Sequence, residues 1–203
     1  MDETALLIAG LGNPGAQYAR HRHNAGFIVT DALHDHYRFG PWRAKFEGFL
    51  SEGTLAGRKT WLLKPMTYMN DSGVSVSAAL RFFKLPLSAL VVMHDEIDLL
   101  GGKLRAKTGG GDAGNNGLRS ITAWLGSGYR RVRIGVGHPG EKRRVTGHVL
   151  GSFTKAELEW FVPMVGAIVE AAPYLAKDDD AGFMNKVAVI LKPPAKNPKP
   201  EAG

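Results

Sequence analysis

Polar side chains stand where apolar runs of the chain end and helical segments begin. Asn13 follows the first apolar run, His23 opens the next helical segment, and Asp95 ends a later apolar run. A neutral imidazole can accept a proton from water, a carboxylate can fix its tautomer, and an amide can bind a peptide group or an oxyanion. Because such positions converge at one edge of an open α/β sheet, these residues predict a hydrolytic site.

Further asparagines occupy similar positions. Asn70 precedes the helical stretch "SGVSV", while Asn115 and Asn116 close the glycine-rich loop "TGGGDAGNNG" before "GLRSI". Asparagine is also an ordinary helix cap and turn residue, so for each one taken alone a capping role is the favoured interpretation. Together with His23 and Asp95 they favour a substrate site.

A nucleotide site is the first alternative. Gly10, Gly12 and Gly15 match G-x-G-x-x-G after an apolar run, which is the dinucleotide-binding fingerprint. The following stretch lacks an apolar helical stripe, and Asp31, the acid at the required spacing, lies inside a predicted helix. The sequence also lacks the P-loop pattern, so neither NAD nor ATP binding is favoured.

Metal and covalent catalysis are equally unsupported. The two H-x-H pairs, at 21/23 and 34/36, come without H-E-x-x-H and without carboxylates at ligand spacing. The second pair is interpreted as solvated and helix-end positions. The sequence contains no cysteine and no G-x-S-x-G elbow, so no nucleophile is evident. We expect no metal and no cofactor.

Composition favours a single basic globular domain. The chain has 203 residues, 44% hydrophobic residues and a net charge of +7. The charge favours a polyanionic partner such as nucleic acid, although it could also serve solubility alone. The N-terminus lacks a signal-peptide pattern, and no apolar stretch approaches the roughly 18 residues that cross a bilayer. We therefore expect a cytoplasmic protein with no membrane association.

Periodicity predicts alternating strands and helices, which imply an α/β fold. Thr154 and Glu157 form a capping box for a helix to about 172, which Pro163 should kink or interrupt. The expectation is one three-layer α/β/α domain, residues 1–191, with a twisted mixed sheet and a disordered Pro/Lys-rich tail, residues 192–203. Strands are expected within 5–10, 46–65 (a hairpin), 89–99, 102–109 and 129–137, and helices within 24–37, 67–83, 115–126, 154–172 and 178–191.

Four stretches together resemble the bacterial-type peptidyl-tRNA hydrolases. They are "GLGNPGAQYARHRHNAG", "KPMTYMNDSG", "HDEIDLLGGKLRAKTGGGDAGNNGLRSI" and "YRRVRIGVGHPG", in family order across most of residues 6–151. The resemblance implies hydrolysis of the ester between a peptide and the 3′-terminal ribose of tRNA, without a covalent intermediate. By the same resemblance, His23 is the general base that activates water and Asp95 orients it. It also implies a monomer that needs no protein partner.

Further roles follow from the resemblance. Asn13 stands where the family discriminates N-blocked peptidyl-tRNA from aminoacyl-tRNA. Asn70 and Asn116 match residues that hold the peptide and the terminal nucleotide. Tyr18 and Tyr68 match aromatic positions that line the site, although Tyr18 could instead anchor its loop.

Basic strand positions are the candidates for tRNA phosphate contacts. Arg105, Lys107 and Arg133 alternate on predicted strands beside the site, and a solvated basic face is the alternative interpretation. The run at 142–144 is a weaker candidate.

Two positions depart from the family pattern. Asn115 replaces the usual His of G-H-N-G, and His21 replaces the usual Thr of T-R-H-N. Both leave His23 and Asp95 in place.

A non-catalytic RNA-binding role is the second hypothesis. It would be indicated by loss of the base, the acid or the amides, and none is lost. A nucleotide-dependent oxidoreductase is the third hypothesis.

Overall fold

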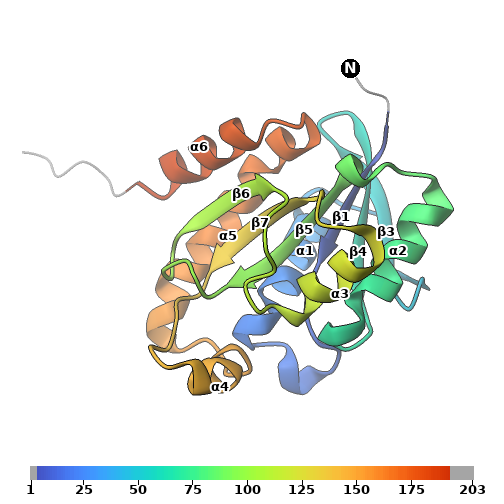
Figure 1. Cartoon of the computed structure of the whole chain (residues 1–203). Coiled ribbons are helices and arrows are strands. Elements are labelled where there is room, and N and C mark those ends of the chain that lie inside the picture. Colours follow the sequence, from blue (N-terminus) through green and yellow to red (C-terminus); the bar gives the residue numbers. More distant parts are fainter. Residues whose placement is uncertain (1–3, 193–203) are drawn as a thin grey trace, which may run out of the picture.

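The computed structural model describes residues 4–192 and contains a seven-stranded mixed sheet (Figure 1). Its spatial order is β2-β3-β4-β1-β5-β7-β6. Strands β4, β1, β5 and β7 run parallel, while β2, β3 and β6 pair antiparallel with their neighbours. The predicted mixed sheet is therefore confirmed. The strands are β1 Leu6–Gly10, β2 Arg43–Lys45, β3 Gly48–Leu55, β4 Arg58–Pro65, β5 Leu90–Glu96, β6 Leu104–Thr108 and β7 Arg130–Gly135.

Helices cover both faces of this sheet. One hydrophobic cluster joins the sheet to α1, α5 and α6, and a second joins it to α2 and α3 on the other face (Figure 1). The three-layer α/β/α prediction is confirmed. The α-helices are α1 Ala25–His36, α2 Ser72–Phe83, α3 Asn116–Leu125, α4 Val145–Val149, α5 Lys155–Ala176 and α6 Asp180–Ile190. Short 3-10 helices are η1 Ala16–Tyr18, η2 Arg22–Asn24, η3 Met69–Asp71, η4 Leu87–Ala89 and η5 Lys142–Arg144. Apart from residue 192, the tail expected at residues 192–203 lies outside the described residues.

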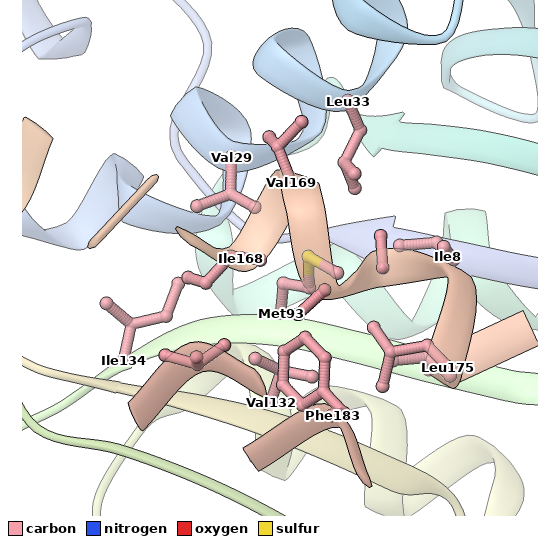
Figure 2. Packing of buried hydrophobic residues seen from close by; sticks show 14 of the residues in the cluster. Ile8, Val29, Leu33, Met93, Val132, Ile134, Ile168, Val169, Leu175 and Phe183 are labelled. Carbon is pink, nitrogen blue, oxygen red and sulfur yellow. The ribbon is translucent and has the colours of Figure 1, made fainter. Parts of the chain in front are cut away.

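The central parallel strands are apolar on both faces because helices cover both. In β1, Ile8 packs toward α1 and α5, while its neighbour Leu7 packs toward α2 and α3. Figure 2 shows Ile8 and Met93 of the strands within one cluster that also contains Ile168 and Leu175 of α5. Burial of each such side chain contributes about 1.5–3 kcal/mol. This packing fixes the strand ends that carry the polar residues.

Helix α5 begins as predicted but continues further. Thr154 and Glu157 form the predicted capping box. The expectation that Pro163 interrupts the helix is wrong, because α5 runs unbroken past Pro163 and Pro173 to Ala176. An interior proline costs about 3 kcal/mol. Burial of the apolar face of α5 outweighs this cost, since nine of its residues are buried in the core.

Helix α5 also meets the length and composition of a membrane span. It has 22 residues and a mean hydropathy of 1.2 over its most apolar window. The expectation that no apolar stretch approaches the length that crosses a bilayer is therefore wrong for this helix, judged by length and composition alone. Its apolar residues pack against α1, α6 and the sheet, which is typical of the core helix of a globular domain.

Candidate active site

A cavity of about 640 Å³ opens at the carboxyl ends of the central strands. Asn13 reaches it from the segment after β1, and Asp95 reaches it from the end of β5. The convergence predicted from the sequence is thus present in the structure. Of the predicted site residues, those that line the cavity are Asn13, His23, Tyr68, Asn70, Asp95 and Asn116. Tyr18, Arg105, Lys107 and Arg133 are not among its lining residues.

His23 and Asp95 are in direct contact. The imidazole Nδ1 lies 2.9 Å from Asp95 Oδ1 and 3.0 Å from Oδ2. Both side chains are buried. Because the carboxylate accepts the Nδ1 proton, Nε2 is the nitrogen left to accept a proton from the cavity. Burial lowers the pKa of His23, but the charge and hydrogen bond of Asp95 outweigh it and raise the pKa above 6.5.

Glycine allows the segment that carries His23 to lie directly on the sheet. A Cβ atom at Gly26 would collide with the Met93 carbonyl oxygen and the Leu11 backbone nitrogen. A Cβ at Gly10 would collide with the Gly26 carbonyl in turn. Gly10, one of the three glycines that match the dinucleotide fingerprint, therefore serves close packing of a helix on a strand. The close contact between the segment around Gly26 and the strands brings His23 to the end of β5.

Asn13 is held by both its backbone and its side chain. Its backbone N–H donates to Asn24 Oδ1 at 3.0 Å, and Asn24 Nδ2 donates to its carbonyl at 2.9 Å. Its own Oδ1 accepts a hydrogen bond from the Met69 backbone at 2.8 Å. Because the Met69 N–H binds Oδ1, the Nδ2 group of Asn13 remains available to donate to a ligand. The sequence predicts only that a helix begins near Asn24, and its two hydrogen bonds to Asn13 arise from the fold.

Aromatic and amide side chains form the rim of the cavity. Tyr68 is 60% exposed, and its ring meets that of Tyr18 edge-on at 6.5 Å. Tyr18 also meets His21 edge-on at 5.4 Å, so this departure from the family pattern contacts the aromatic pair. Asn70 lies in η3, and Asn116 is the first residue of α3.

The predicted basic residues lie in different environments. Arg105 and Lys107 lie on the edge strand β6, and Arg105 is opposite Arg133 of β7. Arg133 Nε donates to Glu96 Oε2 at 2.9 Å, so its guanidinium is already paired with a buried carboxylate. Lys107 is half-buried and Arg105 is exposed.

Sequence reasoning missed basic side chains that line the cavity itself. Arg119 and His138 line the cavity. Lys142 also lines it, although the sequence marks this residue only as part of the run at 142–144, a weaker candidate for phosphate contacts. Arg119 could have been found by helical spacing, because it lies three residues after Asn116 on the same face of α3. Between residues 4 and 192, no group of three or more His, Asp or Glu side chains is placed to hold a metal ion.

Arg22, the neighbour of His23, connects the segment that carries the base to α4 and α5. Its Nε and Nη2 bind the two carboxylate oxygens of Glu157 at 2.8 and 2.6 Å. Its Nη1 donates to the His148 carbonyl at 3.0 Å. Burial by itself raises the pKa of Glu157, but hydrogen bonds from Arg22 and Thr154 outweigh it and lower the pKa to about 2. The pair joins η2 to α4 and α5.

Glu157→Gln is therefore expected to lower the free energy of unfolding at pH 7 by about 1–2 kcal/mol, allowing for solvent screening. Because the pKa of Glu157 is depressed in the folded state, its contribution is present above pH 4.5 and is lost as the pH falls toward 2. Urea unfolding at several pH values measures this. Glu159→Gln, an exposed position on the same helix, is the control, and equal losses in both variants would contradict the argument.

The fold and the site define a class of protein. A histidine–carboxylate pair with amides at the edge of an α/β sheet has the chemistry of a hydrolase. The model of the peptidyl-tRNA hydrolase family matches residues 7–197. The chain therefore belongs to the peptidyl-tRNA hydrolase family, as the sequence motifs indicated.

Individual relatives agree with this assignment. The chain is 57% identical over 187 residues to a peptidyl-tRNA hydrolase of Mesorhizobium japonicum, covering 92% of this chain and 78% of that protein. It is 55% identical to that of Parvibaculum lavamentivorans, covering 96% of each. The crystal structure of peptidyl-tRNA hydrolase from Acinetobacter baumannii superposes with a TM-score of 0.87 at 40% identity, covering 92% of this chain and 95% of the other. The α/β fold prediction is confirmed by this similarity.

Proposed function

We propose that this protein hydrolyses the ester bond between a peptide and the 3′-terminal ribose of tRNA, using water activated by His23. The observation that carries the proposal is the buried contact between His23 Nδ1 and both oxygens of Asp95. It leaves Nε2 as a base beside a cavity lined with amides. Relatives that are 55% and 57% identical bear the name of this activity.

The proposed reaction needs no covalent intermediate. His23 Nε2 accepts a proton from water as the water oxygen attacks the ester carbonyl carbon. The amide of Asn13 donates to the substrate, and the same imidazolium then returns the proton to the departing 3′ oxygen of the ribose. Asp95 stabilises the imidazolium that forms between these steps. An ester is activated enough for positioned water and one base, whose contribution is about 10²–10⁴-fold.

The partner in this proposal is the peptidyl-tRNA itself. Tyr68, Asn70 and Asn116 hold the peptide and the terminal nucleotide at the cavity rim, and the edge-on ring contact with Tyr18 supports Tyr68. Arg119 and Lys142 attract phosphates near the cavity, and Arg105 and Lys107 extend the basic surface along β6. Because one chain supplies every group in the mechanism, we propose a monomer that needs no protein partner or cofactor. A cytoplasmic location without membrane association belongs to the same proposal, since the substrate is a tRNA.

Asn13→Asp is expected to reduce the preference for N-blocked over free aminoacyl-tRNA by about tenfold. Aspartate keeps the acceptor for the Met69 N–H but loses the donor, and its charge attracts the ammonium group of aminoacyl-tRNA. The ratio of kcat/KM values for the two substrates measures the effect. Undiminished discrimination would count against this role of Asn13.

Lys107→Ala is expected to raise KM more than it lowers kcat, because a phosphate contact is made equally in the bound and transition states. The negative slope of log binding constant against log salt concentration should become shallower by about 0.7–0.9. Lys177→Ala, at the end of α5, is the matched control and should change neither value. An unchanged slope in the Lys107 variant would argue that this residue does not contact phosphate.

The experiment that tests the function is release of free tRNA from N-acetyl-aminoacyl-tRNA by the full chain, without added metal or nucleotide. Rapid release supports the proposal. Tight binding of the tRNA without release would contradict it and favour a non-catalytic RNA-binding role. A separate binding measurement with NAD tests the oxidoreductase hypothesis, which tight NAD binding together with no release of tRNA would favour.

A further inference from the structure

Asn115, which departs from the family pattern, performs two tasks with the two atoms of its amide. Its Oδ1 accepts hydrogen bonds from the backbone N–H groups of Gly117 at 3.0 Å and Leu118 at 3.1 Å, which caps α3. Its Nδ2 donates to Asp95 Oδ1 at 3.2 Å. The cap determines the amide orientation, because only Oδ1 can accept from the helix. The donor therefore faces the carboxylate.

The oxygen that Asn115 contacts is also bound by the catalytic pair. Asp95 Oδ1 lies 2.9 Å from His23 Nδ1 and 3.2 Å from Asn115 Nδ2. Asp95 is 3% exposed, so hydrogen bonds from the protein replace water in fixing its carboxylate. With donors from two different segments on one oxygen, the carboxylate plane is held against rotation.

The loop that presents Asn115 is itself anchored to the sheet and the helix. The Asn115 backbone N–H donates to the Asp112 carbonyl at 2.8 Å, and Thr122 Oγ1 donates to Asp112 Oδ1 at 2.9 Å. Buried Arg131 of β7 donates through Nη1 to the Gly111 carbonyl at 2.8 Å. The position of Asn115 thus depends on the fold rather than on substrate.

We propose that Asn115 is a positioning residue that orients Asp95, and through it His23, by donating a hydrogen bond to the carboxylate. The inference rests on the proposed function, since it assigns Asn115 a part in that hydrolysis. An amide donor does not titrate, so it holds Asp95 at every working pH, whereas an imidazole at this position could lose or gain a proton. The departure from the usual histidine therefore keeps a donor while removing a titratable group from the pair.

Asn115→Ser separates the two tasks. Serine is also a good N-cap, so α3 stays capped, but its side chain is too short to replace the bond to Asp95. We expect kcat/KM to fall about 10–100-fold with a melting temperature close to that of the wild type. The acid limb of the pH–kcat/KM profile should move to higher pH, because the unshared charge of Asp95 then favours protonated His23 more strongly. The other titratable groups that line the cavity are unchanged in this variant: Tyr68, Glu96, Arg119, His138 and Lys142.

Two further variants complete the test. Asp179→Ser replaces the N-cap of α6, which lies outside the cavity, and should leave both kcat/KM and the profile unchanged. Asn115→His restores a donor and should recover activity relative to Asn115→Ser. An Asn115→Ser enzyme with unchanged activity and an unchanged pH profile would overturn the proposal. A loss of activity explained entirely by a lower melting temperature would also overturn it. So would an Asn115→His enzyme as slow as the Asn115→Ser enzyme.

An NMR titration of the His23 imidazole in wild type and Asn115→Ser gives a readout that needs no substrate. A higher His23 pKa in the variant supports the proposal, and an unchanged pKa would overturn it. This readout stays informative if the wild-type protein fails to release tRNA, so failure of the proposed function and failure of the inference are distinguishable.

Discussion

His23→Ala is expected to lower kcat for N-acetyl-aminoacyl-tRNA by about 10²–10⁴-fold, because it removes the base that activates water. KM should change little, since His23 acts on water rather than on the tRNA. The side chain lies at the cavity and belongs to neither hydrophobic cluster, so the fold should survive the truncation. Single-turnover release of tRNA, measured beside circular dichroism and thermal melting, gives both quantities.

A matched histidine and a chemical rescue make this result specific. His36→Ala, exposed at the C-terminal end of α1, should retain full activity. Added imidazole should restore part of the lost rate in His23→Ala, because truncation leaves space beside Asp95 within the cavity. Activity in His23→Ala within a fewfold of the wild type would reject His23 as the general base.

Much of the site could be predicted because its residues stand at strand ends. Asp95 ends the apolar run that becomes β5, and parallel neighbours β1 and β5 bring their carboxyl ends to one edge. Polarity after an apolar run was enough to find Asp95 and Asn13. The contact between His23 and Asp95 joins residues 72 positions apart, and periodicity carries no such distance information.

Features that depend on strand register or on short elements were not predictable. Arg133 looked like a free cation, yet it pairs with Glu96 of the neighbouring strand, a contact that only the β5–β7 pairing creates. Helix α4 has five residues, too few for a helical period to appear in sequence. The helix interruption predicted at Pro163 failed for the opposite reason. There the local signal was strong, but tertiary packing overrode it. Local pattern therefore predicted the layers, and long-range packing determined which side chains are free to act.

The acid–base pair has a consequence for stability as well as for rate. Asp95 raises the pKa of His23 above 6.5, so the ion pair contributes fully to stability below that pH. The contribution is lost as the pH rises through the folded-state pKa of His23. Since His23 must be neutral to accept a proton, the protein is active in the range where it has lost part of this stabilisation.

Asp95→Asn is expected to lower kcat/KM by about 10²–10⁴-fold, the second large effect at this site. The amide keeps the shape of the carboxylate but removes the charge that stabilises the imidazolium. It can also present its Nδ2 to His23, which favours the wrong tautomer. Burial then acts on His23 without its counter-charge, so the His23 pKa should fall below 6.5.

Two measurements check this Asp95→Asn prediction together. The residual activity should show its acid limb at lower pH than the wild type, because the His23 pKa has fallen. The increase in stability on acidification through the His23 pKa should disappear, since a neutral partner no longer binds imidazolium more tightly than imidazole. Asp98→Asn, just beyond β5, is the matched control, and its pH profile should match that of the wild type. An unshifted acid limb in Asp95→Asn would mean that the carboxylate does not set the protonation of His23, and the base would then have to be sought among the other groups lining the cavity.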